Sequence, residues 1–189
     1  GRDSSGALWT GSENGIALVD ADLQRILTYP ADCIPCSRIH ALYCLRDTVL
    51  FATGSGLLRV ETMGTPDNFG DDRRTDIYDT DGLPSNNTTA LAAGDRIWVG
   101  TDAGLARCSK DFSQIDAYTS AQGLLDNYIT CLAVSDTLVL VGTKKGLNRF
   151  HAGRFDTLLN GSRFAVRAIA IAADSGRATS SSQARASAV

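Results

Sequence analysis

The sequence predicts an all-β chain of β-propeller repeats, in which each repeat is a blade of four antiparallel strands. The first observation is a short pattern that occurs four times, with its last glycine at Gly15, Gly56, Gly104 and Gly146, which gives a repeat of roughly 42 residues. The second is that each repeat divides into apolar runs of strand length, with turn residues between them. The third is that no window shows a sustained helical period of 3.6 residues.

The four copies of the pattern lie at residues 8–16, 49–57, 97–105 and 139–147. Each copy has hydrophobic residues, then Gly-Thr or a close variant, two variable residues, and Gly-Leu or Gly-Ile. The second interval is 48 residues rather than 41 or 42, because an insertion of eight residues lies within 61–74. In the third repeat we expect strands at 88–92, 96–100, 104–108 and 112–118. Four strands in about 40 residues are typical of one blade, which must be stacked between other blades to bury its faces.

The repeats predict one array over residues 1–175, with units near 1–29, 30–78, 79–118 and 119–158 and a partial unit at 159–175. Residues 176–189 lack large apolar side chains, so we expect a disordered tail there. Inner strands are expected at 39–45, 88–92, 129–134 and 166–172. The first unit has three strands and no inner strand, so joining it to the last would close a ring of four blades. We expect an open arc instead, as an incomplete piece of a larger ring.

Three segments of the third repeat resemble the two-component regulator propeller family: Gly82-Leu83-Pro84-Ser85-Asn86, Trp98-Val99-Gly100-Thr101 and Gly104-Leu105-Ala106-Arg107. The fourth repeat, at 123–149, is similar to the same pattern with Leu140 in place of Trp. The first two units are more divergent, and the resemblance covers about residues 6–175.

This resemblance implies a ligand-sensing or binding module, like the extracytoplasmic sensor region of a hybrid two-component histidine kinase, and a link to polysaccharides. It also implies a periplasmic or extracellular location. The implied partners are an oligosaccharide or another polar small ligand, and further propeller blades or a kinase region in a longer parent chain. Rings of this family usually have about seven blades, more than this chain supplies. The chain itself contains no kinase segment.

Composition limits the other functions. The formal net charge is −3 and the basic residues are scattered, so no nucleic-acid partner is expected. No apolar run reaches the length of about 18 residues that a membrane-spanning helix needs. The histidines, His40 and His151, lie in no recognisable catalytic motif, so we expect neither an enzyme nor a cofactor. Two alternatives remain open: a secreted propeller lyase or hydrolase that cleaves polysaccharides, and a protein-interaction scaffold.

Several features have a structural interpretation beside a functional one. Cys33 and Cys36 form a C-x-x-C pair at a predicted turn. We interpret them as incidental turn residues, with a local disulfide as the alternative, and expect no metal site. The acidic segment 67–74 lacks the spacing of a calcium loop, so we expect a solvated loop. One arginine recurs at the same position in three repeats: Arg59, Arg107 and Arg149. A ring of guanidinium groups would bind an anion, but we favour a structural role such as pairing with a neighbouring blade.

Ligand binding is predicted on the face where the connections into the inner strands meet those between the second and third strands. These connections vary between repeats while the strand residues recur, as expected if the loops determine specificity. Eight polar side chains of these connections are candidate ligand contacts: Arg38, Asn86, Asn87, Asp102, Asp126, Asn127, Lys144 and Lys145. The alternative is that they are turn residues selected for backbone geometry.

Overall fold

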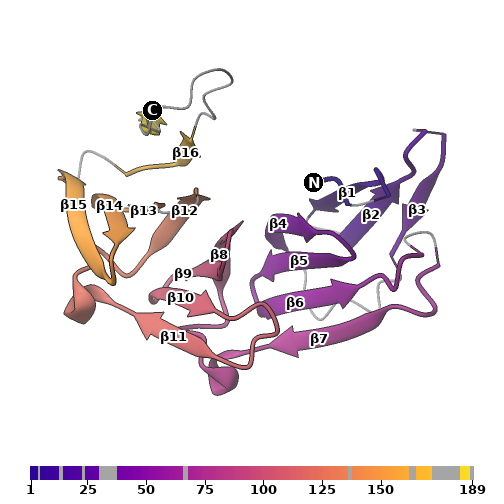
Figure 1. Cartoon of the computed structure of the whole chain (residues 1–189), viewed down its shortest axis with the longest axis horizontal. Coiled ribbons are helices and arrows are strands. Elements are labelled where there is room, and N and C mark those ends of the chain that lie inside the picture. The colour runs from indigo at the N-terminus through magenta and orange to yellow at the C-terminus, as the bar shows by residue number, and fades with distance from the viewer. Residues whose placement is uncertain are drawn as a thin grey trace.

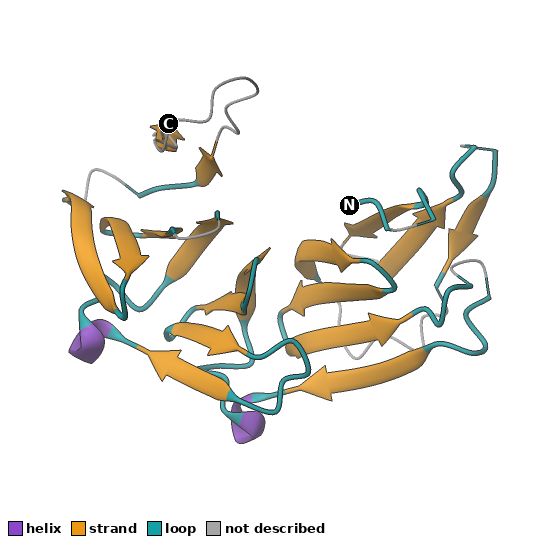
Figure 2. Cartoon of the chain, in the orientation of Figure 1, coloured by secondary structure: helices purple, strands orange, loops and turns teal. Residues whose placement is uncertain are grey.

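The computed structural model describes residues 1–3, 5–12, 15–22, 24–29, 38–65, 68–135, 138–161, 165–171 and 184–187. These residues form an array of antiparallel sheets that follow one another round an open arc (Figure 1). Within them, the helical elements are two short 3-10 turns, η2 (Asp79–Asp81) and η3 (Ser120–Gln122) (Figure 2). The predicted fold class, an incomplete arc of about four propeller blades, is confirmed.

Each blade is one antiparallel sheet with its strands in chain order. Blade 1 comprises β1 (Leu8–Ser12), β2 (Gly15–Val19) and β3 (Ile26–Thr28). Blade 2 comprises β4 (Ile39–Leu45), β5 (Thr48–Thr53), β6 (Gly56–Glu61) and β7 (Arg73–Ile77). Blade 3 comprises β8 (Thr88–Ala93), β9 (Ile97–Thr101), β10 (Leu105–Cys108) and β11 (Ile115–Tyr118). Blade 4 comprises β12 (Ile129–Val134), β13 (Val139–Thr143), β14 (Gly146–His151) and β15 (Arg154–Asn160).

The innermost strand of each blade lines the concave side of the arc, and these strands contact one another in sequence; in blade 1 this strand is β1, which aligns with the second strands of the other blades. β1 packs against β4, β4 against β8, β8 against β12, and β12 against β16 (Ala168–Ile171). Blade 1 and β16 stand apart at the two ends of the arc (Figure 1). The chain therefore forms an open arc, as the sequence predicts, and not a closed ring of four blades.

One element lies where the sequence predicts a disordered tail. Within 176–189, the described residues form β17 (Ala184–Ser187), which pairs antiparallel with β16. This pairing needs no large side chains, because backbone N–H and C=O groups form the ladder. The prediction therefore fails at these four residues, and the rest of 176–189 lies outside the described residues.

The Gly of the Gly-Thr motif is required by the contact between neighbouring blades. A β-carbon on Gly100 of blade 3 would lie 2.6 Å from Cγ2 of Ile129 in blade 4. A β-carbon on Gly11 of blade 1 would likewise lie 2.5 Å from Cγ2 of Ile39 in blade 2. Both distances are shorter than carbon atoms tolerate, so at these two boundaries only glycine allows the isoleucine that begins the next inner strand to approach.

A large residue near the start of the motif packs between blades. Trp98 is buried and lies against Phe150 of blade 4, with ring centroids 5.0 Å apart. Trp9 lies against Phe51 of blade 2 in the same way, at 6.0 Å. Edge-to-face contacts of this kind add to the burial of apolar area. The core therefore consists of successive layers between blades, as stacking of repeats requires.

The insertion in blade 2 is part of this packing. Phe69 lies 4.5 Å from the ring of Tyr29 in blade 1, and the Tyr29 hydroxyl donates a 2.6 Å hydrogen bond to Asp72. Burial raises the pKa of Asp72, although the Tyr29 hydrogen bond opposes the shift. The expectation of a solvated loop at 67–74 is therefore wrong for these two side chains, because they cover the aromatic layer between blades 1 and 2.

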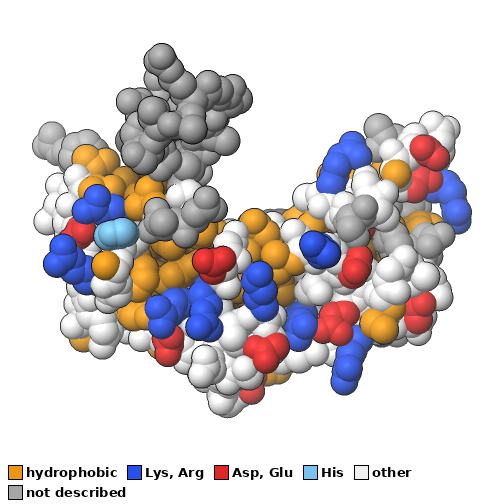
Figure 3. Space-filling view, viewed as in Figure 1, with side chains coloured by type: hydrophobic (Ala, Val, Ile, Leu, Met, Phe, Trp, Pro, Cys, Tyr) orange, Lys and Arg blue, Asp and Glu red, His pale blue; other side chains and the backbone are white. Residues whose placement is uncertain are grey.

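The recurring arginines have acidic partners within their own blades. Arg107 pairs with Asp116 at 2.6 Å and Arg149 with Asp156 at 2.8 Å, each on the neighbouring outer strand. Arg59 pairs with Glu61 on its own strand. The structural role favoured from the sequence is supported, but these ion pairs do not cross between blades. Figure 3 shows that basic and acidic side chains are interspersed over the face in view.

Candidate functional site

A β-bulge recurs where the inner strands of blades 2, 3 and 4 begin. In blade 2, Ile39 pairs with Thr53 and Ala41 with Ala52, so His40 has no residue opposite. Thr89 and Thr130 are the equivalent extra residues of blades 3 and 4. A bulge turns its extra side chain away from the regular alternation of a strand. These inner strands therefore carry a row of bulged side chains, one at the start of each strand.

The bulged side chains link each blade to the next. His40 Nδ1 lies 2.7 Å from the carbonyl oxygen of Thr88 in blade 3. The Thr89 hydroxyl donates a 2.7 Å hydrogen bond to the carbonyl of Ile129 in blade 4. The Thr130 hydroxyl donates to the carbonyl of Val166. These three equivalent hydrogen bonds form an inter-blade ladder along the ends of the inner strands.

One residue directly precedes the inner strand in each of blades 2, 3 and 4, at equivalent positions: Arg38, Asn87 and Tyr128. Their backbones have the same role. The carbonyl oxygens of Arg38, Asn87 and Tyr128 accept hydrogen bonds from the amides of Gly54, Asp102 and Lys144, respectively. The backbone thus repeats while the side chain changes from cationic to amide to phenol. That is the pattern expected of a scaffold that presents variable groups.

Two of the predicted residues pair with each other in blade 3. The Asn87 side-chain amide donates a 2.9 Å hydrogen bond to the Asp102 carboxylate. In blade 4 the equivalent pair is Tyr128 and Lys144, whose ammonium nitrogen lies 3.4 Å from the centre of the Tyr128 ring. The two positions thus form an amide–carboxylate contact in one blade and a cation–π contact in the next.

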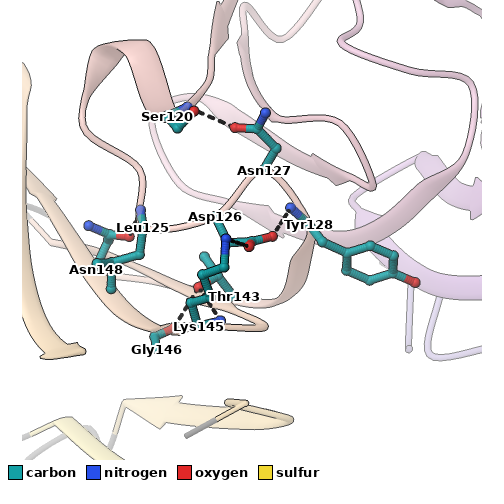
Figure 4. Close-up of polar contacts among 9 residues, drawn as sticks. All are labelled: Ser120, Leu125, Asp126, Asn127, Tyr128, Thr143, Lys145, Gly146 and Asn148. Carbon is teal, nitrogen blue, oxygen red and sulfur yellow. Dashed lines mark hydrogen bonds and ion pairs between the residues drawn. The ribbon is translucent and has the colours of Figure 1, made fainter. Parts of the chain in front are cut away.

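Asp126 and Lys145 form a second contact in blade 4 (Figure 4). The Lys145 ammonium group lies 2.8 Å from the Asp126 carboxylate, which also accepts a 2.8 Å hydrogen bond from the Tyr128 amide. Partial burial acts to raise the pKa of Asp126, but these two contacts outweigh it and the pKa is lowered. The carboxylate is therefore ionised and fixes the backbone from which Tyr128 projects.

Asn86 and Asn127 hold the loop backbone in equivalent ways. The side-chain oxygen of Asn86 accepts a 2.7 Å hydrogen bond from the amide of Asp79, and that of Asn127 accepts one of 2.7 Å from Ser120. These amides begin the 3-10 turns η2 and η3. The geometry supports the alternative role of these two residues, as side chains selected for the loop backbone.

A buried asparagine supports the same loop in blade 4. Asn148 is fully buried and accepts a 2.9 Å hydrogen bond from the Leu125 amide (Figure 4). It also donates a hydrogen bond to the carbonyl of Gly123. The equivalent residues of blades 2 and 3 are Leu58 and Ala106. Asn148 is not among the residues predicted from the sequence, although a polar residue at a repeat position that is otherwise apolar is a feature by which it can be identified.

An open cavity of about 550 Å³ lies at the ends of the inner strands. Its lining combines the bulged residues with their neighbours in the chain: Ser12, Arg38, Ile39, His40, Thr89, Tyr128, Ile129 and Thr130. Of the eight predicted residues, Arg38 lines this cavity, and Lys144 lies over the ring of Tyr128 at its wall. The bulged residues and Tyr128 were not among the eight. No periodicity in the sequence marks a bulge, but Tyr128 aligns with Arg38 and Asn87.

The other predicted features give no second site. Cys33 and Cys36 lie outside the described residues. Cys44, Cys108 and Cys131 are free thiols. In the part of the chain that is described, His, Cys, Asp and Glu form no group of three or more suited to a metal ion. Nor does a helix there have the length and hydrophobicity to cross a membrane.

Comparison with known proteins identifies the fold. No family model matches the sequence, and no curated protein matches it. The extracellular domain of the putative one component system BT4673 from B. thetaiotaomicron superposes with a TM-score of 0.72 at 22% identity, covering 90% of this chain and 23% of that chain. The extracellular domain of the putative hybrid two component system BT3049 from the same organism superposes with a TM-score of 0.71 at 18% identity, covering 90% of this chain and 25% of that chain.

A third similar structure is PorZ, a bacterial surface component of the type-IX secretion system of Porphyromonas gingivalis. It superposes with a TM-score of 0.59 at 16% identity and covers 84% of this chain and 21% of that chain. At these identities the likeness is one of fold. This chain has the blade fold of these extracellular and surface proteins, and it spans about a quarter of the length of each.

Proposed function

We propose that this chain is the ligand-binding part of a sensor, and that its ligand occupies the cavity at the ends of the inner strands. The observation that carries the proposal is the position shared by Arg38, Asn87 and Tyr128. There the backbone hydrogen bond is the same in blades 2, 3 and 4 and the side chain differs. Arg38 and Tyr128 line the cavity. A repeated scaffold with variable groups near an opening is the usual arrangement of a specificity site.

The proposed ligand is polar and small, and an oligosaccharide fits the lining best. The cavity offers hydroxyl, imidazole and guanidinium groups for hydrogen bonds, together with the amphipathic ring of Tyr128. The fold likeness to extracellular domains of two-component systems supports a sensor role and an extracellular or periplasmic location. Further blades and a signalling region in a longer parent chain are part of this proposal.

The proposal is tested by titrating the purified chain calorimetrically with a panel of neutral and acidic oligosaccharides. We expect one class to bind, and Tyr128→Ala to weaken that binding by about tenfold or more, because an aromatic wall and its packing are lost. Arg96→Gln is the control, since Arg96 is exposed in the β8–β9 turn at the far end of the strands from the cavity. Unchanged binding in Tyr128→Ala would exclude this cavity.

We further propose that the chain binds its ligand without cleaving it. Glycosidic bond cleavage commonly uses a pair of carboxyl groups. The described residues that line the cavity supply one imidazole, that of His40, and no carboxylate. Incubation of the bound sugar with the chain, followed by chromatography, is expected to return the sugar intact. Release of shorter or unsaturated products would assign the chain to the polysaccharide-cleaving alternative.

A further inference from the structure

The inter-blade ladder uses the hydrogen-bond donor of each bulged side chain. A carbonyl oxygen only accepts hydrogen bonds, so the 2.7 Å contact with the Thr88 carbonyl requires that Nδ1 of His40 carry a proton. The hydroxyl groups of Thr89 and Thr130 each give their one proton to a backbone carbonyl oxygen further along the array. In the neutral form of the imidazole, these three side chains therefore have no second proton to donate.

What the bulged side chains offer to a ligand is therefore a set of acceptors. In the neutral ring of His40 the second nitrogen, Nε2, carries a lone pair. A threonine oxygen that has given its proton also keeps lone pairs. All three side chains line the same open cavity of about 550 Å³, a volume within the usual range of small-molecule sites. The cavity thus has one acceptor from each of blades 2, 3 and 4.

Complementarity to these acceptors defines the ligand. A row of acceptors is satisfied only by donors, which a ligand supplies as hydroxyl or amine protons. The described residues that line the cavity include no Asp or Glu, so an ammonium group would leave water for neutral acceptors alone. That transfer is more costly for a cation than for a hydroxyl group. The arrangement therefore favours a neutral ligand with several hydroxyl groups.

We propose that the ligand of this cavity is a neutral saccharide, whose free hydroxyl groups donate hydrogen bonds to Thr89, to Thr130 and to Nε2 of His40. This proposal rests on the proposed function and names the ligand class of that site. The site then recognises the hydroxyl proton rather than the sugar oxygen. A sugar without that proton leaves an acceptor unpaired when it covers the row, and each unpaired acceptor weakens binding.

The test replaces single hydroxyl groups of the ligand by fluorine, which is similar in size but has no proton to donate. Maltotriose, laminaritriose and mannotriose are titrated calorimetrically against the chain at about pH 8, where an imidazole is ordinarily neutral. The sugar that binds is then compared with its monodeoxyfluoro forms. We expect at least two of these forms to bind about three- to tenfold more weakly, which corresponds to one neutral hydrogen bond each.

Thr89→Val identifies the acceptor on the protein. Valine has nearly the shape of threonine without the oxygen, so this variant is expected to bind one fluorinated form about as well as the parent sugar. Comparing two sugars within one variant cancels any loss of stability from the missing bond to Ile129. Thr130→Val is expected to act in the same way on another hydroxyl position. Thr157→Val is the control, because Thr157 is exposed on β15 outside the cavity, and it should leave every ratio unchanged.

The outcomes separate this inference from the function on which it rests. Equal binding of the parent sugar and all its fluorinated forms overturns the inference, as does a fluorine effect that persists in full in both Thr89→Val and Thr130→Val. If acidic oligosaccharides bind and neutral ones do not, and Tyr128→Ala weakens that binding, the sensor site stands and the inference fails. If no sugar of either kind binds, both fail.

Discussion

Gly100 of blade 3 faces Ile129 of blade 4 so closely that a β-carbon on the glycine would lie 2.6 Å from Cγ2 and 2.9 Å from Cβ of the isoleucine. Gly100→Ala is therefore expected to lower the free energy of unfolding by about 1–3 kcal/mol, the usual cost of overpacking a core. Chemical denaturation measures the loss. Gly54→Ala is the control, because nothing lies within 4 Å of the added methyl group, and it should leave stability unchanged.

The chain itself suggests how to relieve this clash. The positions equivalent to Gly100 and Ile129 in blades 2 and 3 are occupied by Ala52 and Thr88. Thr88 is smaller than isoleucine, and its hydroxyl bonds to the backbone amide and carbonyl of Thr53. The double variant Gly100→Ala with Ile129→Thr should therefore be more stable than the sum of the two single changes predicts. Simple additivity would show that the two positions are not coupled.

Asn148 is the main support of the loop that leads to Tyr128. Asn148→Leu copies the side chain of Leu58 in blade 2 but leaves the Leu125 amide and the Gly123 carbonyl without their partner. We expect the free energy of unfolding to fall by about 1–3 kcal/mol, the cost of an unmade buried hydrogen bond. Hydrogen exchange at the Leu125 amide should accelerate in parallel. Exchange at the wild-type rate would mean that the loop holds its conformation without Asn148.

Substitution of Asn127 is expected to reduce stability less than substitution of Asn148, and Asn127 has a matched control variant that keeps the hydrogen-bond acceptor. Its side-chain oxygen accepts from the Ser120 amide, so Asn127→Ala should lower the free energy of unfolding by about 1 kcal/mol, as at other helix starts. Asn127→Asp keeps the acceptor and is expected to retain wild-type stability. If ligand binding fell in Asn127→Ala with no loss of stability, Asn127 would contact the ligand directly.

Cys108 makes stability depend on pH in alkaline solution. Burial, and to a smaller degree Asp116, raises the pKa of this thiol from 9.0 to about 12. Between these values the unfolded chain has lost the proton that the folded chain retains, so the free energy of unfolding falls as the pH rises. Denaturation at a series of pH values should show this slope, and Cys108→Ala should make it shallower. The same slope in both proteins would assign it to other groups.

The repeat predicts most of this fold, because strand length, turn residues and the recurring Gly-Thr motif are all local features of the sequence. The predicted inner strands at 39–45, 88–92 and 129–134 coincide with β4, β8 and β12. The packing of Trp9 and Trp98 between blades follows from the same alignment. Blades that must stack have few places for their largest side chains.

The site is harder to predict, because it depends on which residues face each other across strands. His40, Thr89 and Thr130 reach the cavity through bulges, and an unpaired residue is a property of strand register that apolar periodicity does not contain. The role of Phe69 was missed for a similar reason. Its contact with Tyr29 joins residues 40 positions apart in the sequence, through a loop with no counterpart in the other repeats.

The inter-blade ladder gives the opening a mechanical property. The side chains that line the cavity are also the ones that span the boundaries between rigid sheets, as His40 does between blades 2 and 3. Under the proposed function, a ligand in this cavity contacts several blades at once, so its binding either strengthens or weakens the hydrogen bonds between them. We therefore expect the tilt of one blade against the next to be the coordinate that responds to ligand binding.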